Sequence, residues 1–255
     1  MSKALRGRIA LAAAVLLLFL CVIAARLPAS WILSAAPKFN GQSPQCESVS
    51  GTIWLGACSG LAAGIYRFSS AKWELEALPL LRGTVAAHLA LSGNDLKVDG
   101  LFQRRLNGAI SATEVQASFS MPNALIPQLP GNLSGHVAAN IAALAVDGFK
   151  LQYIAGRIDV QGLTQTAPER MLLGSYQLEF PDSPTTDKPP VGMLRDMGGP
   201  LEVHGTLTLT AEPGYLLDGT VAPRPDASAS LLQQIAVLGS PDAAGRRSFS
   251  QAATF

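Results

Sequence analysis

Cysteine is the residue type in this sequence whose spacing points most directly to chemistry. Cys46 and Cys58 have eleven residues between them, and the third cysteine, Cys21, lies nearer the N-terminus. In an oxidising compartment, two thiols at this spacing predict one disulfide bond. Closing a loop of this length stabilises a fold by about 3 kcal/mol in the chain-entropy model. The alternative is a metal pair, but two thiols without a nearby histidine make a poor metal site.

Histidine and serine offer the other routes to a catalytic or metal site. The three histidines, His88, His136 and His204, fall on the polar positions of expected strands, where a solvated side chain is the simplest interpretation. Cys58-Ser59-Gly60 lacks the flanking pattern of a nucleophilic serine on a tight turn. Gly198-Gly199-Pro200 has no following lysine to complete a phosphate-binding loop. The sequence therefore predicts no enzyme, no metal and no cofactor.

The composition indicates what kind of elements would position these residues. The net charge is +1, which gives no electrostatic case for a nucleic-acid partner. Glycine (24) and proline (17) are frequent, while charged residues make up only 15% of the chain. That balance favours many short strands joined by tight turns over a helical bundle. The length of 255 residues suits one ordinary domain, or two small ones, plus a targeting segment.

The N-terminus carries the pattern of a membrane anchor. Lys3, Arg6 and Arg8 precede an uncharged run over residues 9–25, which ends at Arg26. At about 1.5 Å per residue the run spans roughly 26 Å, the short end of what crosses a hydrocarbon core. Because the basic residues come first, the positive-inside rule places the start of the chain in the cytoplasm and the rest in the periplasm.

Cleavage of this segment as a signal peptide is the alternative to an uncleaved anchor. Val22-Ile23-Ala24 offers small residues to a peptidase, although the apolar run is longer than a signal peptide requires. No small residue precedes Cys21, which is therefore interpreted as a buried membrane thiol and not as a lipoprotein site. The expected organisation is a cytoplasmic tail (1–8), a transmembrane anchor (9–26), a linker (27–48) and a periplasmic β-rich domain (49–255).

Alternation of apolar and polar residues dominates the chain after residue 49. In the clearest case, Leu133, Val137, Ile141 and Ala143 share one register of a strand. The same pattern recurs in residues 84–92, 114–119, 172–180 and 201–209. Short turns such as Asp147-Gly148 separate these segments, and no helical crossover is long enough for a parallel sheet. The pattern predicts a mainly β fold: a curved antiparallel meander with one or two short helices.

Helical periodicity is scarce. Residues 228–238 give the one good amphipathic pattern, in which Asp226 or Ser228 would cap the start and Gly239 the end. Its apolar face carries Leu231, Leu232, Ile235 and Leu238.

Aromatic residues gather in the first third of the expected domain. Trp54, Tyr66, Phe68 and Trp73 form the main cluster. Core packing of a small sheet accounts for them. The alternative is an exposed interaction face.

Three groups of residues together resemble the type II secretion system protein N family. The first is Gly51-Thr52-Ile53-Trp54-Leu55-Gly56, similar to the family's N-terminal G-x-[VI]-W-x-G motif. The second comprises Gly199, Pro200, Leu201, Gly205, Gly214, Tyr215, Gly219, Pro223 and Arg224. The third comprises Gly239, Pro241, Asp242 and Gly245. With the anchor, this resemblance covers nearly the whole chain, while the Cys46/Cys58 pair departs from the family's core pattern.

The resemblance implies a non-catalytic inner-membrane component of the apparatus that exports folded proteins across the outer membrane. Implied partners are other secretion subunits with periplasmic domains, notably protein C, with the outer-membrane secretin as a further candidate. The sheet would act as a scaffold, and an exposed strand edge would accept a partner strand. Long curved antiparallel sheets are also similar to AsmA-like envelope proteins, so carriage of lipid along an apolar groove is the alternative function.

Overall fold

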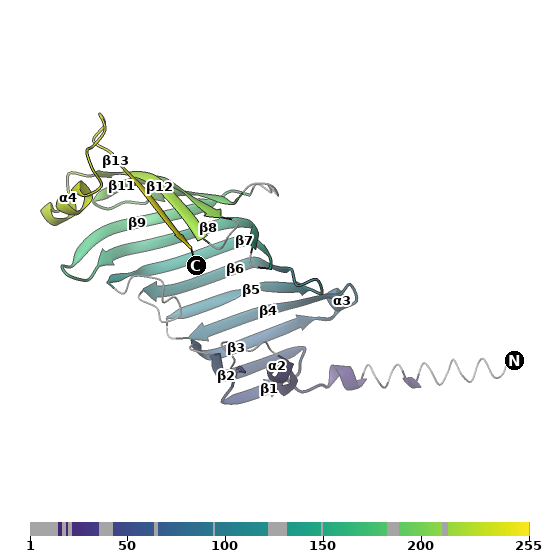
Figure 1. Ribbon diagram of the computed structural model, residues 1–255. Coiled ribbons are helices and arrows are strands. Elements are labelled where there is room, and N and C mark those ends of the chain that lie inside the picture. The colour runs from purple at the N-terminus through teal and green to yellow at the C-terminus, as the bar shows by residue number, and fades with distance from the viewer. Residues whose placement is uncertain are drawn as a thin grey trace, which may run out of the picture.

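A single antiparallel sheet forms the body of the molecule (Figure 1). The computed structural model describes residues 15–16, 19, 22–35, 43–63, 66–93, 95–121, 132–148, 150–182, 189–210 and 214–254. Within them the sheet has 13 strands, and each strand pairs with its neighbours in sequence. The predicted antiparallel meander is therefore confirmed, and Figure 1 shows that β11–β13 turn across the line of the preceding strands.

The elements follow in simple order along the chain. The strands are β1 (Ser48–Gly51), β2 (Leu55–Ala63), β3 (Tyr66–Glu76), β4 (Thr84–Gly93), β5 (Leu96–Arg105), β6 (Ile110–Met121), β7 (Leu133–Asp147), β8 (Lys150–Gln165), β9 (Met171–Phe180), β10 (Val191–Asp196), β11 (Leu201–Thr210), β12 (Gly214–Pro223) and β13 (Arg247–Thr254). The named helices are α2 (Ser30–Ala35), α3 (Ala77–Leu80) and α4 (Ala229–Ala236).

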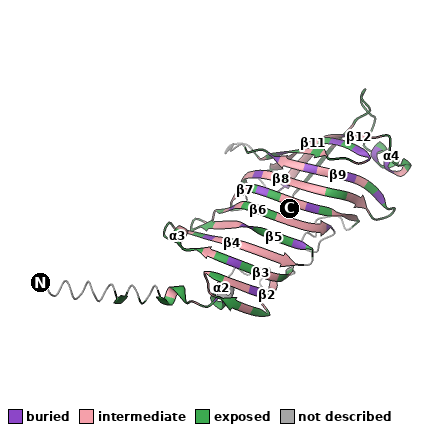
Figure 2. Ribbon diagram, turned by 180° about the vertical axis from the view of Figure 1, so that it is seen from behind, coloured by how far each residue is buried: buried purple, intermediate pink, exposed green. Residues whose placement is uncertain are grey.

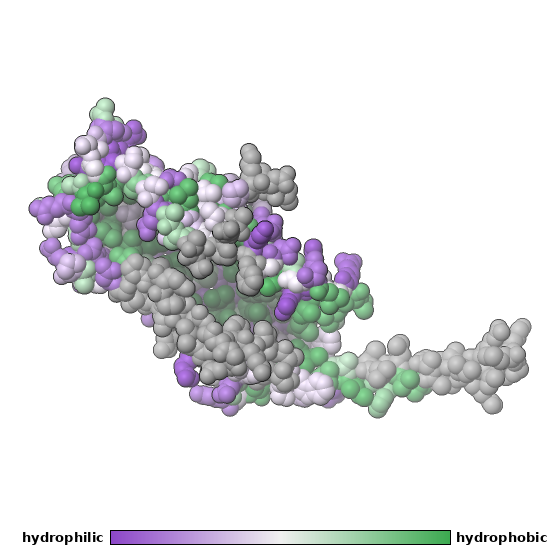
Figure 3. All heavy atoms as spheres, in the orientation of Figure 1, coloured by the Kyte–Doolittle hydropathy of each residue, from purple (hydrophilic) through white to green (hydrophobic). Residues whose placement is uncertain are grey.

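One face of the sheet is apolar across all its strands. The strand pairing joins one residue of every strand into a row: Val49, Cys58, Ala71, Leu91, Val98, Ala117, Ala139, Ile158, Leu178, Leu194, Gly205, Gly219 and Phe249. A Cβ on Gly219 would lie 2.6 Å from the Phe249 ring, so glycine there makes room for the last side chain of the row. Figure 3 shows hydrophobic residues in the hollow at the middle of the molecule.

The opposite face is polar. The neighbouring row consists of Ser48, Ser59, Ser70, Ser92, Lys97, Ser118, Ala138, Asp159, Gln177, Arg195, His204, Thr220 and Ser248. Alternation of side chains along each strand separates the two rows. Most positions are half-buried, as Figure 2 shows, because a single sheet has two surfaces and little interior.

Two hydrophobic clusters cover the ends of the apolar face. At the first end, Ala29, directly before α2, and Ile32 of α2 pack with Cys58, Ala71 and Trp73. At the other end, α4 packs its side chains on strands β9–β12. The predicted helix is confirmed, with the Ser228 hydroxyl accepting a hydrogen bond from the backbone N of Leu231 at 3.3 Å.

The apolar side of α4 is narrower than the sequence pattern indicated. Leu231 and Ile235 are buried, whereas Leu232 and Leu238 are 43% and 44% exposed. The helix contacts the sheet through Leu231 and Ile235, and Leu232 and Leu238 lie outside this hydrophobic cluster.

β-bulges change the face of some residues that the alternation placed together. Ile141 pairs with Gly156 and Ala143 with Ala155, so Ala142 is an extra residue in β7. Because side chains alternate with a period of two, this insertion moves Ala143 off the face of Ile141. The predicted shared register of Ile141 and Ala143 is therefore wrong.

The expected membrane anchor falls mostly on residues outside the described set. Within the described residues, no helix has the length and apolar character needed to cross a bilayer.

Candidate functional site

The turn between β1 and β2 ties the N-terminal segment to the sheet. Trp54 Nε1 donates a hydrogen bond to the carbonyl oxygen of Ala24 at 2.8 Å. The backbone N of Ile53 donates to the carbonyl oxygen of Leu27 at 3.0 Å. The first motif group therefore holds the end of the expected anchor and the start of the linker against the β1 end of the sheet.

The first motif group packs against Trp73 of β3. Gly51 has a φ of +88°, which favours glycine, and a Cβ on Gly56 would lie 2.4 Å from the Trp73 ring. Trp73 is buried, and its Nε1 donates to the carbonyl oxygen of Ile53 at 3.2 Å. Core packing, the first of the two interpretations of the aromatic cluster, therefore holds for Trp73.

Cys46 and Cys58 form the predicted disulfide, with 5.7 Å between their Cα atoms. Cys58 lies in β2 on the apolar face, where it is 2% exposed. The bond fastens the segment before β1 to this end of the sheet. The prediction of a disulfide is confirmed.

The second motif group gathers around Arg224 at the other end of the molecule. Arg224 Nη1 donates to the carbonyl oxygens of Gly199 at 2.9 Å and Leu201 at 3.2 Å. Arg224 Nη2 donates to Asp196 Oδ2 at 2.6 Å, and its backbone N donates to the Pro200 carbonyl oxygen at 2.8 Å. One side chain thus joins the ends of β10, β11 and β12.

Asp196 is the member of this cluster that the sequence did not single out. Burial raises the pKa of its carboxyl, but hydrogen bonds from Arg224 and from the backbone N of Val203 outweigh burial and hold the pKa below its ordinary value. Burial, together with the Asp196 charge, raises the pKa of nearby Tyr176 to about 12. Asp196 and Arg224 are therefore both ionised at neutral pH. Such an ion pair, called the Arg224 clasp below, suits a structural role better than proton transfer.

The third motif group shapes the turn from α4 into β13. Asp242 Oδ1 accepts hydrogen bonds from the backbone N of Ala244 at 2.8 Å and of Arg246 at 2.9 Å. Gly239 and Gly245 have φ values of +104° and +77°, which allow the chain to reverse. Pro241 lies in the same turn.

The remaining motif residues lie in the strands that carry β13. Gly205 faces Gly219 across β11 and β12, and Gly214 and Tyr215 pair with the end of β13. Pro223 is the last residue of β12. The second and third motif groups therefore build the C-terminal edge of the sheet together.

The two edges of the sheet differ in how far they are covered. β1 has four residues. Thr52, the residue that follows β1, forms an isolated β-bridge with Pro28. β13 has eight residues, and within the described part of the chain it pairs with β12 alone. From Ser248 to Thr254 it contains no proline and no charged residue, the features that usually block pairing at an edge.

The sequence profile of the family "Type II secretion system (T2SS), protein N" matches residues 44–250. The chain belongs to this family. A relative from Aeromonas hydrophila, named "Type II secretion system protein N", is 25% identical over 248 residues, which cover 95% of this chain and 96% of the relative. No solved structure matches the chain.

The protein N profile spans both ends of the sheet. It begins before β1 and ends inside β13, so it includes all three motif groups and both cysteines. Trp54 and Arg224 were identified from the sequence, but their partners Ala24 and Asp196 were not. The available signal for Asp196 was its place two residues before the Gly198-Gly199-Pro200 turn.

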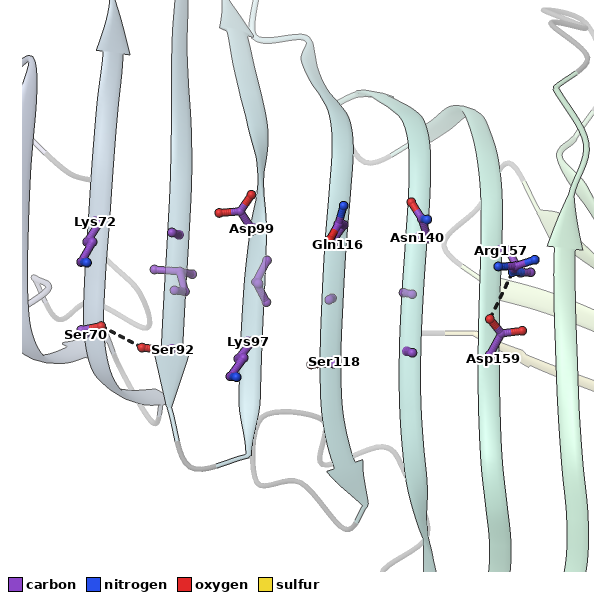
Figure 4. Close-up of a pocket in the computed structure, with 16 residues that line it drawn as sticks. Ser70, Lys72, Ser92, Lys97, Asp99, Gln116, Ser118, Asn140, Arg157 and Asp159 are labelled. Atoms are coloured by element: carbon purple, nitrogen blue, oxygen red, sulfur yellow. Dashed lines mark hydrogen bonds and ion pairs between the residues drawn. The ribbon is translucent and has the colours of Figure 1, made fainter.

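A polar hollow of about 660 Å³ lies on the face opposite the apolar row, over β3–β8 (Figure 4). Its ion pair joins Arg157 Nε and Asp159 Oδ2 at 3.1 Å, and Ser70 and Ser92 share a hydrogen bond of 2.7 Å. These contacts orient polar side chains without pairing a nucleophile with a base.

The histidines lie on the polar register, as expected. His88 Nε2 is 3.4 Å from Asp99 Oδ1, and His204 Nε2 is 3.5 Å from Glu202 Oε1, with both histidine side chains more than half exposed. His136 is also exposed. Across the described residues, no three side chains of His, Cys, Asp or Glu are placed to hold a metal ion.

Proposed function

We propose that this chain is a non-catalytic inner-membrane component of a type II secretion system and that its extracytoplasmic sheet is an assembly scaffold. Its membership of the protein N family supports a place in secretion. The Cys46–Cys58 disulfide supports an oxidising compartment for the domain. Residues 9–26 would anchor it, with residues 1–8 in the cytoplasm.

The contrast between the two sheet edges carries the scaffold proposal. β1 is short and meets the N-terminal segment at its last residue, Gly51, whereas β13 is eight residues long and offers the outward-facing backbone groups of every second residue. An open edge of this length is suited to strand addition, in which main-chain hydrogen bonds supply affinity. The proposed partner is a strand of another secretion subunit, with protein C first and the secretin second.

The width of the sheet separates the β1 edge, next to the expected anchor, from the open β13 edge. Strands spaced by about 4.8 Å place β13 roughly 58 Å from β1 along the curve of the sheet. Trp54 and the disulfide fix the β1 end, while the Arg224 clasp and the Asp242 turn fix the β13 end. A stiff body between the two ends raises the effective concentration of the open edge for neighbouring subunits.

Lysine substitutions on the open edge test this proposal. Ser250→Lys with Ala252→Lys places charge on exposed positions of β13, where it should hinder strand addition without filling a core site. The matched control is Ser48→Lys with Ser50→Lys, on exposed positions of the covered edge. We expect loss of co-purification with protein C for the β13 variant alone. Equal retention of protein C by both variants would contradict the proposal.

Lipid carriage along the apolar face is the second candidate function. The clusters that contain α2 and α4 residues occupy the two ends of this face, while Val98, Ala117, Ala139 and Ile158 continue it between them. These four residues are half-buried. Native mass spectrometry of the purified chain distinguishes the functions, because a carrier retains stoichiometric phospholipid and a scaffold does not.

A further inference from the structure

An exposed group of apolar side chains projects from one end of the strands. Leu78, Leu81 and Leu106 are 78%, 86% and 88% exposed, and Val85 and Ile110 are 45% and 43% exposed. Single exposed leucines are common on protein surfaces, but a contiguous group indicates a binding surface. We call these five residues the leucine patch.

Direct contacts between two turns hold the leucine patch together. The turn after α3 meets the turn between β5 and β6, where the backbone N of Leu106 donates to the carbonyl oxygen of Gly83 at 3.1 Å. A Cβ on Gly83 would lie 2.8 Å from Leu106 Cδ1. Thr84 pairs with Arg105 in the adjoining strands. The patch is thus a fixed feature of the sheet end.

The N-terminal segment joins the sheet at this same end. The backbone N of Leu75, two residues before α3, donates to the carbonyl oxygen of Trp54 at 2.7 Å. Trp54 in turn binds the carbonyl oxygen of Ala24. Figures 1 and 2 agree that helical residues 22–25 leave the sheet on the side where α3 projects. A bilayer that holds the N-terminal segment would therefore lie next to the patch.

The two turns that bear Leu78, Leu81 and Leu106 carry only positive charges, and the exposed acid Glu76 directly precedes α3. The two turns, residues 77–83 and 104–110, contain Arg82, Arg104 and Arg105 and no acidic residue. All three arginines are exposed. Apolar side chains flanked by arginines match the interface of a bilayer, where alkyl groups enter the acyl boundary and guanidinium groups meet lipid phosphates.

We infer that the leucine patch docks on the surface of the membrane that holds the N-terminal anchor, with Leu78, Leu81 and Leu106 in the acyl boundary. This inference rests on the anchor of the proposed function but not on the open β13 edge. Docking would fix the tilt of the sheet and leave α4, at the opposite strand end, in the aqueous phase.

Fluorescence quenching in vesicles tests the docking. The full-length chain, with Cys21 replaced by serine and the disulfide retained, is reconstituted into phosphatidylglycerol/phosphatidylcholine vesicles whose lipids are brominated either near the headgroup or at the middle of the acyl chain. An environment-sensitive dye is attached at Leu81→Cys or at Val237→Cys, which is equally exposed, at 86%, but lies at the end of α4. A third position, Phe19→Cys, reports on the anchor itself.

We expect strong quenching at Leu81 by the bromines near the headgroup, strong quenching at Phe19 by the mid-chain bromines, and no quenching at Val237. Replacing Leu78 and Leu106 by serine should weaken docking at Leu81 by about tenfold for each leucine removed. Quenching at Phe19 without quenching at Leu81 would overturn the docking and leave the anchor standing. The absence of quenching at both positions would overturn docking and anchor together. Capture of a protein at Leu81 in cells, with no quenching in vesicles, would make the patch a protein interface and overturn the inference.

Discussion

Single side chains with several backbone partners hold the two ends of this sheet. Arg224 binds two carbonyl oxygens and one carboxylate, and Trp54 reaches a carbonyl oxygen thirty residues away in sequence. Sheet pairing alone cannot fix such turns, because their backbone groups lie beyond the ladder of hydrogen bonds. These residues therefore define where the sheet begins and where its open edge is formed.

Substitution of Asp196 by asparagine should make the clasp independent of pH. The folded-state pKa of Asp196 lies below its ordinary value of 3.8, so the stability that its ionisation contributes is complete above that value and is lost as pH falls through the lower pKa. We expect Asp196→Asn to lower the urea midpoint of unfolding at pH 7 and to match wild type once the pH lies below the lowered pKa of Asp196. The matched control is Glu202→Gln, an exposed acid whose loss should change little. An equal midpoint for Asp196→Asn and wild type at pH 7 would show that the clasp is dispensable.

Removal of the disulfide should destabilise the anchored end of the sheet. The bond closes a loop with a sequence separation of 12. We expect the double variant Cys46→Ser, Cys58→Ala to lose about 3 kcal/mol in free energy of unfolding, measured by urea denaturation. Oxidised and reduced wild-type protein provide the control, and identical urea midpoints for the two would contradict a stabilising role.

The structurally important residues could be predicted from the sequence more readily than the residues that they contact. The spacing of Cys46 and Cys58 was enough to pair them, because local chain separation limits the choice. The contact between Asp196 and Arg224 depends on the register of β10, β11 and β12, which a lone sequence does not specify. The leucine patch was not predicted either, because pairing of β4 with β5 brings its two turns together.

At the scale of elements, α4 should contribute to the stability of the fold through its buried residues, Leu231 and Ile235. Leu231 is 2% exposed and its neighbour Leu232 is 43% exposed. We expect Leu231→Ala to cost about 2–5 kcal/mol in free energy of unfolding, because it leaves a cavity over β9–β12. Leu232→Ala is the matched control and should cost about 0.5 kcal/mol or less. Similar losses for the two variants would mean that α4 does not pack as described.

Alternation predicted most of the strands, and helical periodicity predicted α4. Alternation failed where a bulge breaks its period of two. The bulge at Ala142 in β7 reverses the register for Ala143, and Glu114 adopts a φ of +54° in β6. α3 was not predicted, because four residues around Pro79 are too short to show helical periodicity. Elements longer than two turns, or strands without insertions, were the ones that a residue pattern could specify.

At the scale of the molecule, the sheet joins two unlike edges. The segment that leads to the expected anchor meets the β1 edge at Gly51 and Thr52. The β13 edge is built by residues within the part of the chain that matches protein N. The motif residues therefore share a structural role in forming both ends of one sheet. This arrangement explains why many of them are glycines and prolines in turns and few are groups that could react.

Site-specific photocrosslinking in living cells tests the scaffold most directly. A photoreactive residue at Ser250 or Ala252 of β13 is compared with the same residue at Ser48 or Ser50 of β1, all of which are exposed. We predict capture of a secretion subunit, protein C or the secretin, from the β13 positions and not from the β1 positions. Capture of lipid alone, or equal capture of the same subunit from both edges, would contradict a scaffold that works through its open edge.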